Sequence, residues 1–312
     1  MSGEKKYDIL TVFDTCVDFL VDCGDVVPEF GQKEKLINGY SFEMGGSGCI
    51  FACQTAKLGL KTTGIGSVGI DNMGDIVLEG LSSASVDISH VRKSDEINTG
   101  LGVTLVKSDG DRSILTYMGT IDMVDGGALK ALLPDTRHLH ICSYYLLKSL
   151  QPAWKDIVLQ AKKYGVTISL DTNWDPDEEW DGGIREILPL IDIFLPNENE
   201  IMYITGQKEY TSALKYASEL VPLVVVKCGK DGAVAYHQGK TYECKALDVT
   251  VKDTVGAGDS FNGGFLYGWL NNMPIEQCLK IGTVCGSLST QQPGGSAGQP
   301  DLKAIEGLGL SR

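Results

Sequence analysis

Short apolar runs alternate with amphipathic segments from about residue 130 onwards. Continuous runs of Val, Ile and Leu are typical of strands that are buried on both faces. Strands separated by helices pair in parallel through right-handed crossovers. The sequence therefore predicts an α/β fold, a doubly wound and mainly parallel sheet flanked by helices, with strands at Arg137–Cys142, Val166–Leu170, Ile191–Leu195 and Leu223–Lys227, and helices at Pro152–Tyr164, Asn197–Thr205 and Thr211–Leu220.

The first 120 residues mix this pattern with strands of a second kind. Buried strands are expected at Ile9–Phe13 and Lys61–Val68, and helices at Ser47–Leu58 and Asp71–Ser83. The interleaved segments look antiparallel and half-exposed, and Asp109-Gly110 suits a hairpin turn. We expect a small β-sheet lid from segments of about 15–44 and 95–120, inserted in one domain that spans 1–312, with strands at Phe19–Asp25, Glu34–Glu43, Leu101–Lys107 and Arg112–Tyr117.

Charge and cysteine content exclude several kinds of partner. Lys and Arg number 27 against 41 Asp and Glu, which gives a net charge of −14. Nucleic acids and anionic membranes require a basic surface, so neither is an expected partner. No apolar run reaches the length of a membrane span, and the N-terminal sequence does not resemble a signal peptide. The nine cysteines include no CxxC pair, so we expect buried, reduced thiols in a cytoplasmic protein.

The segment VKDTVGAGDSFNGGF, residues 251–265, carries the strongest chemical signal. Gly256-Ala257-Gly258 is a turn of small residues that leads into a helix. Free amides at such a helix start, with the helix dipole behind them, bind phosphate or an oxyanion. Asp259 lies at the rim, where its carboxylate can take a proton from a hydroxyl group. The alternative is that Asp259 is only an acidic cap and the glycines only a tight turn.

This string resembles the second signature of the ribokinase-like (PfkB) family of carbohydrate kinases, DTxGAGDxFxGG, at every fixed position. The resemblance implies that Asp259 is the catalytic base. It implies that the amides of Gly256, Ala257 and Gly258 form the anion hole for the transferred γ-phosphoryl group of ATP. Asp253 and the carbonyl of Val255 match positions that often help to bind a monovalent cation such as K⁺.

A second glycine segment, Gly45-Gly46-Ser47-Gly48, precedes the predicted helix and resembles the first family signature. Glycine lets a substrate lie against the main chain, so Gly45, Gly46 and Ser47 are expected to bind the acceptor. Ile50 stands where the family commonly has Asn, which leaves the identity of the sugar open.

Two aspartates near the first strand are further acceptor candidates. Asp18 matches a substrate-binding Asp of the family, although Phe13 replaces the usual Gly five residues before it. Asp14 shares this role or is only a carboxylate at a strand end.

Asn197-Glu-Asn-Glu200 follows a predicted strand and matches the NxxE motif of the family. The resemblance implies that Asn197 lies near the phosphates of ATP and that Glu200 organises Mg²⁺ through water. Mg²⁺ keeps several waters, so few direct protein ligands are expected. The alternative is a capped helix with an acidic first turn.

Three further segments resemble parts of the family site. Asn173 belongs to a DxN segment, but Asp175 stands where the family often has an Arg, so a phosphate-clamping Arg is absent there. Lys227 and Gly229 are candidates for contacts with ATP. The segment 292–298 either closes over the adenine or is a plain surface loop. His138 and His140 on one strand are interpreted as core or strand-end residues, and the four tryptophans as packing residues. The acidic segment Asp175–Asp181 is interpreted as a solvated turn and helix start.

Taken with the resemblance, these features favour a kinase that transfers phosphate from ATP, with Mg²⁺, to a hydroxymethyl group of a small sugar. The alternatives are a nucleoside or pyridoxal-type kinase, and a non-catalytic sugar-binding relative. Tyr40, Phe42, Tyr117 and Met118 in the lid leave open an acceptor that contains a base. A dinucleotide-dependent oxidoreductase is excluded because no GxGxxG follows the first strand. Exposed lid edges also make a homodimer through the lid plausible.

Overall fold

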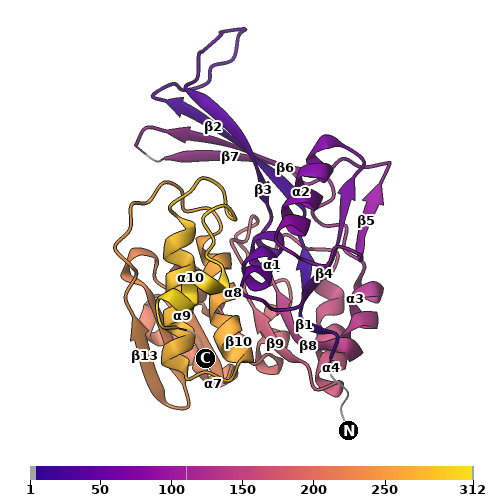
Figure 1. Ribbon diagram of the computed structural model, residues 1–312, viewed down its shortest axis with the longest axis vertical. Helices are drawn as coiled ribbons and strands as arrows, with labels where there is room; N and C mark the ends of the chain where they lie inside the picture. The colour runs from indigo at the N-terminus through magenta and orange to yellow at the C-terminus, as the bar shows by residue number, and fades with distance from the viewer. Residues whose placement is uncertain (1–4, 110, 311–312) are drawn as a thin grey trace.

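The computed structural model describes residues 5–109 and 111–310, and its centre is one large sheet flanked by helices (Figure 1). The strand order is β13-β12-β11-β10-β9-β8-β1-β4-β5. Pairing is parallel from β11 to β5 and antiparallel at β11–β12 and β12–β13. The expected doubly wound fold is confirmed, with strands at Tyr7–Phe13 (β1), Thr62–Gly69 (β4), Val91–Ser94 (β5), Thr136–Ile141 (β8), Thr167–Leu170 (β9), Ile193–Phe194 (β10), Leu223–Lys227 (β11), Ala233–His237 (β12) and Lys240–Cys244 (β13).

Each face of this sheet has its own hydrophobic core, because successive side chains of a strand point to opposite faces. Leu10, Ile168 and Val224 pack toward one group of helices, and Ile9, Ile193 and Val225 pack toward the other. The first group consists of Gly126–Leu132 (α3), Trp154–Lys163 (α4), Ile184–Ile187 (α5), Glu198–Thr205 (α6) and Tyr210–Leu220 (α7). The second consists of Ser47–Lys57 (α1), Ala257–Leu270 (α8), Ile275–Ser289 (α9) and Leu302–Gly307 (α10).

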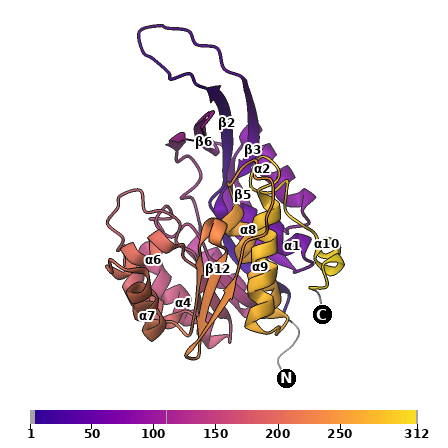
Figure 2. The same ribbon diagram turned by 90° about the vertical axis from the view of Figure 1, so that its left-hand side faces the viewer.

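A separate four-stranded sheet, the lid, projects from one end of the main sheet (Figures 1 and 2). Its order is β3-β2-β6-β7, with strands at Gly39–Gly45, Cys16–Gly24, Gly100–Lys107 and Arg112–Tyr117. The expectation of a wholly antiparallel lid is wrong, because β2 and β6 pair in parallel. The reason is that β2 continues from β1 and β6 follows β5, and these parallel strands send the chain out of the main sheet in the same direction. The strand expected from Glu34 begins only at Gly39.

The register of the lid assigns its side chains to two faces. Asp18 pairs with Glu43 on β3 and with Gly102 on β6, so these three residues share a face. Arg112 lies on the same face, because it pairs with Val106, which pairs with Asp22. The opposite face carries Phe19, Tyr40, Phe42, Leu115 and Tyr117.

Several smaller expectations have a structural outcome. The remaining helix, α2, spans Asn72–Ser83 and begins at its cap Asp71. Asp175 is not part of a solvated turn, since it is buried and accepts hydrogen bonds from the amides of Asp177 and Trp180. The predicted turn residue Gly110 lies outside the described residues.

All nine cysteines are free thiols, and six of them are buried. Within residues 5–109 and 111–310, no helix combines the length and apolar character needed to cross a membrane.

Candidate active site

The turn before α8 exposes backbone amides at the start of the helix. Gly256 has φ of +68°, and a Cβ atom there would lie 2.7 Å from the Cα of Gly295, so only glycine fits. No described group accepts a hydrogen bond from the amides of Gly256 and Gly258. The amide of Ala257, in contrast, donates to the carbonyl of Thr254 at 3.3 Å. Two of the three predicted anion-hole amides are therefore unpartnered.

Asp259 lies in the first turn of α8, where it is 8% exposed. Burial raises the pKa of its carboxyl group well above the ordinary value, and the nearby Asp171 raises it further. Lys227 and a hydrogen bond from Ser47 oppose this rise. Ser47 belongs to the other glycine segment, so the fold brings the two signature segments together at Asp259.

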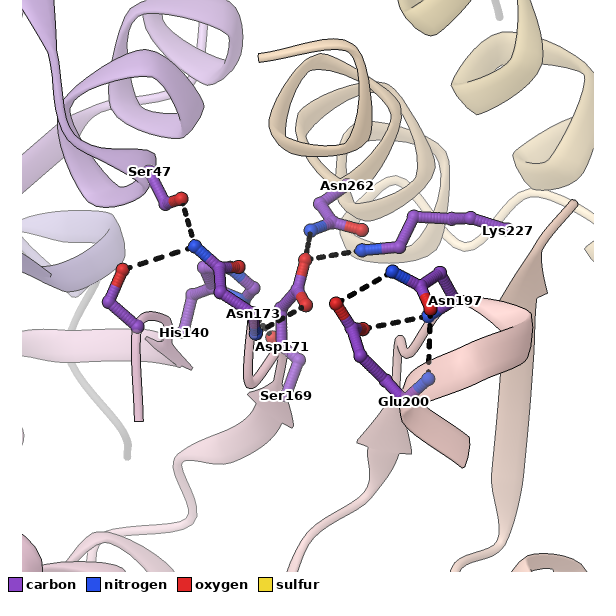
Figure 3. A network of polar contacts seen from close by, with 10 residues as sticks. Ser47, His140, Ser169, Asp171, Asn173, Asn197, Glu200, Lys227 and Asn262 are labelled. Atoms are coloured by element: carbon purple, nitrogen blue, oxygen red, sulfur yellow. Dashed lines mark hydrogen bonds and ion pairs between the residues drawn. The ribbon is translucent and has the colours of Figure 1, made fainter. Parts of the chain in front are cut away.

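A buried polar network joins the ends of the central strands to α8 (Figure 3), and the charges of its Asp171 and Lys227 act on Asp259. Asp171 follows β9 and accepts hydrogen bonds from Lys227 on β11 and from Asn262 on α8. Asn173 has a left-handed backbone with φ of +56° and donates to the hydroxyl groups of Ser47 and Ser143. The strand ends and α8 therefore present their polar side chains at one place.

Asp14 holds the start of α1. Its carboxylate accepts from the amides of Ser47 at 2.9 Å and Gly48 at 2.8 Å, and from the hydroxyl group of Ser143 at 2.5 Å. An anion at a helix N-terminus is stabilised by these amides and by the helix dipole. Asp14 therefore positions the glycine segment, and its oxygens are already occupied.

Asp18 extends from the lid into the same region. A Cβ atom at Gly45 would lie 2.7 Å from one carboxylate oxygen, and one at Gly102 would lie 2.8 Å from the other. Burial, together with the negative charges of Asp14, Asp253 and Glu43, raises the pKa of Asp18 to about 6. The two glycines leave room for this carboxylate, and no described residue donates a hydrogen bond to it.

Asn197 and Glu200 form a capping box at the start of α6. The Asn197 side chain accepts from the amide of Glu200, and the Glu200 carboxylate accepts from the amide and side-chain nitrogen of Asn197 at 2.8 and 2.7 Å. The capped-helix interpretation thus describes their geometry. Burial and the nearby Asp171 raise the pKa of Glu200 to about 7, while Lys227 opposes the rise. Glu200 is therefore electrostatically linked to the buried network.

A cavity of about 650 Å³ opens beside the turn before α8. Its lining includes Lys227, Gly229, Gly258 and Thr254, and also the apolar side chains of Leu247, Val249, Val251 and Phe261. The segment 292–298 does not line this cavity. Gly295 instead lies against Ile50, and Gly294 lies against Glu43 of the lid.

The loop before α8 also meets the lid. Asp253 accepts from the amides of Val255 and Gly294, each at 3.0 Å. Arg112, on lid strand β7, lies 3.8 Å from Asp253 and donates to the hydroxyl group of Thr254 at 2.6 Å.

Two of the departures from the family pattern, Phe13 and Ile50, have a packing explanation. The ring of Phe13 occupies the space above Gly64, which has no side chain to block it. Ile50 is 2% exposed, and its side chain packs against Gly256 and Gly295. Ile50 thus packs against the turn that precedes α8.

The sequence did not single out Asp171, Asn262, Thr254 or Arg112 for these roles. Asn262 lies inside the glycine signature, and Asp171 opens the DxN segment, so both motifs contained the signal. Arg112 lies in no recognisable motif, because its role depends on the contact between the lid and the loop before α8. His138 and His140 are structural as expected, since both are fully buried and bond to Ser169 at 2.7 Å.

A comparison with models of protein families identifies the family of this chain. The model of the pfkB family of carbohydrate kinases matches residues 10–302. The chain belongs to this family. Membership confirms the expected enzyme class, an ATP-dependent sugar kinase.

Relatives of this kinase are similar along almost their whole length. A 6-phosphofructokinase that uses ATP, from Thermoanaerobacterium thermosaccharolyticum, is 27% identical and aligns with 98% of this chain and 94% of its own. A 5-dehydro-2-deoxygluconokinase from Geobacillus thermodenitrificans is 27% identical, with 97% and 93% covered. The structure of Arabidopsis thaliana ribokinase complexed with ribose and ATP has a TM-score of 0.83 and 25% identity, with 98% and 99% covered.

Proposed function

We propose that this kinase transfers the γ-phosphoryl group of ATP to a hydroxymethyl group of a small sugar. The observation that supports this most directly is the position of Asp259. It lies beside the amides of Gly256 and Gly258, which donate to no described group, and Ser47 favours the ionised form of its carboxyl group. A base next to an anion site provides what phosphoryl transfer to an alcohol requires, since positioning and charge stabilisation supply most of the catalysis.

In this proposal, residues 1–312 act as one domain whose lid closes over the acceptor. Asp259 takes the proton from the acceptor hydroxyl, and Gly256 and Gly258 stabilise the transferred group. Asp18, Gly45, Gly46, Ser47 and Asn173 hold the acceptor. Asp14 acts through α1, and the amide of Ala257 contributes only if it leaves Thr254.

ATP would occupy the cavity beside α8. Its apolar lining residues suit a nucleobase, and Lys227, Gly229 and Gly258 suit the phosphates. Asn197 would support this side through Glu200, because its own side chain is bound in the capping box.

Mg²⁺ is expected with ATP, where it neutralises charge on the phosphates. The described residues include no cluster of three or more metal-ligating side chains. Both oxygens of Glu200 already accept hydrogen bonds from Asn197. The site therefore fits a magnesium ion held mainly by phosphate and water, with Glu200 acting through water.

A potassium ion near Asp253 and the carbonyl of Val255 is a separate proposal. The Asp253 carboxylate lies in the loop that shapes the anion hole, so a cation there would hold the turn. Replacing K⁺ with Na⁺ in the assay should then lower kcat. Equal kcat values in K⁺ and in Na⁺ would contradict the proposal.

The alternative of a nucleoside or pyridoxal-type kinase has less support. Tyr40, Phe42 and Tyr117 lie on the lid face opposite Asp18, where they are not in a position to stack on an acceptor base. A non-catalytic sugar-binding protein would have no chemical need for Asp259 beside unpartnered amides.

We also propose that two copies pair through the outer lid face, where Tyr40 is 69% exposed and Leu115 is 63% exposed. A Tyr40→Asp variant should then run as a smaller species than wild type in size-exclusion chromatography with light scattering. A cytoplasmic location fits nine cysteines without a disulfide.

The decisive experiment incubates the protein with ATP, Mg²⁺ and a mixed pool of sugars and nucleosides, with mass-spectrometric detection of phosphorylated products. We expect a phosphorylated sugar with wild type and far less of it in the same time with Asp259→Asn. A phosphorylated nucleoside would favour the alternative, and no product in any mixture would contradict a catalytic role.

A further inference from the structure

The acceptor side of the lid carries an unusual row of residues. Glu43, Asp18 and Gly102 are paired side by side on β3, β2 and β6, on the face toward the main body. Glycines beside Asp18 leave its carboxylate uncovered within the sheet. The two acidic side chains therefore face whatever binds beneath the lid.

A third carboxylate approaches this row from the body of the protein. The Glu43 side chain lies against Gly294, since a Cβ atom added to Gly294 would be 2.9 Å from a carboxylate oxygen of Glu43. The amide of Gly294 in turn donates to Asp253 at 3.0 Å. The charges that raise the pKa of Asp18 are all carboxylates, those of Asp14, Asp253 and Glu43.

The nearby cations are already paired. Lys227 is bound to Asp171, and Arg112, on the same lid face as Asp18, contacts Asp253 and Thr254. Among the residues that the structure describes, no Lys or Arg forms an ion pair or a hydrogen bond with Asp18 or Glu43. A phosphate or carboxylate on the acceptor would therefore meet two carboxylates, those of Asp18 and Glu43, that have no cationic partner.

We propose that the acceptor site discriminates against anionic sugars, that Glu43 and Asp18 are the specificity-determining pair, and that the substrate is an uncharged or amino-bearing sugar. This inference rests on the proposed function. It separates the chain from two similar kinases whose names contain a sugar phosphate and a sugar acid, 6-phosphofructokinase and 5-dehydro-2-deoxygluconokinase. Juxtaposed like charges suppress wrong partners strongly in binding sites.

The test compares acceptors that share a carbon skeleton: fructose with fructose 6-phosphate, and glucose with glucosamine and gluconate. We expect kcat/KM for the neutral or amino member to exceed that for the anionic member by about 10²-fold. The ratio should fall as salt is added, because salt screens charge. A preference for either anionic acceptor would overturn the inference and leave the kinase function intact.

Charge variants of Glu43 sharpen the test. Glu43→Gln and Glu43→Lys should raise kcat/KM for the anionic acceptors relative to the neutral ones, with the larger shift for Lys. Glu34→Lys makes the same charge change at an exposed lid position and serves as the control. An unchanged ratio in folded Glu43→Lys, checked by its melting temperature, would contradict the assignment.

The two proposals can fail separately. If no acceptor is phosphorylated, the proposed function fails, and calorimetric titration of the same sugar pairs in the presence of ADP still measures the charge preference. Tighter binding of the neutral members would support the inference. Equal or tighter binding of the anionic members, or no binding of any sugar, would overturn it.

Discussion

Arg112 and Thr254 join the lid to the catalytic body. The guanidinium group, on β7, donates to the threonine hydroxyl at 2.6 Å, and Thr254 lies two residues before Gly256 of the anion-hole turn. A lid residue is thus hydrogen-bonded to the segment that would hold the transferred phosphate.

Loss of this contact should impair closure. We expect Arg112→Ala to lower kcat/KM for the acceptor by about 10–100-fold, the equivalent of one charge-assisted hydrogen bond. Hydrolysis of ATP without acceptor should rise as a share of turnover, because an open lid admits water. Steady-state assays of both reactions measure this. Lys107→Ala, a lid variant whose partner is Asp111, is the control, and identical behaviour of the two variants would count against a role in closure.

Asp259→Asn should lower kcat by about 10²–10⁴-fold with ADP binding nearly unchanged, because only the base is lost. Rapid-quench turnover and calorimetric titration with ADP separate the two quantities. Near-normal turnover would remove Asp259 as the base.

The same variant should be more stable than wild type at neutral pH. The pKa of Asp259 is raised in the folded state, so between the unfolded and folded pKa values only the folded protein retains the proton. The free energy of unfolding therefore falls as pH rises through this range. Melting temperatures should favour Asp259→Asn at pH 7–8, and the difference should vanish below about pH 4, near the unfolded pKa of Asp. A difference that is constant with pH would mean that the carboxyl group is not perturbed.

Acceptor binding should depend on pH through Asp18. Burial raises the pKa of Asp18 to about 6, and the ionised form accepts hydrogen bonds from sugar hydroxyl groups better than the protonated form. KM for the acceptor should therefore fall as pH rises through about 6. Initial rates across pH 5–8 test this, and Asp18→Asn should flatten the KM profile. A step that persists in the variant would assign the titration to another group.

Ile50→Asn restores the common family residue and should nevertheless be harmful. The side chain packs against Gly256 and Gly295, so an amide there would be buried against backbone. We expect a loss of about 2–5 kcal/mol in the free energy of unfolding by urea. Ile50→Val should cost about 0.5–1.5 kcal/mol. A stable Asn variant with tighter acceptor binding would show that position 50 faces the acceptor.

The sequence predicted the main sheet well, because its buried strands and helices are encoded by local periodicity. It also singled out the two glycine segments, and the fold brings them together, since Ile50 packs against Gly256. The parallel pairing of β2 with β6 could not be read locally, since half-exposed strands of either orientation alternate in the same way.

Contacts between distant segments were equally hidden from the sequence. Lys227 reads as a phosphate ligand at a strand end, and only the fold shows that Asp171 already binds it. The sequence alone suggests that Ile50 replaces a polar contact, and only the fold shows that its side chain packs against Gly295. Such relationships depend on which loops approach each other, and no local pattern encodes this.

A single residue, Gly46, separates the end of lid strand β3 from the start of α1. Any swing of that strand is transmitted through one peptide unit to the helical turn that carries Ser47. In the proposed mechanism, closure of the lid and placement of Ser47 beside the acceptor are therefore coupled.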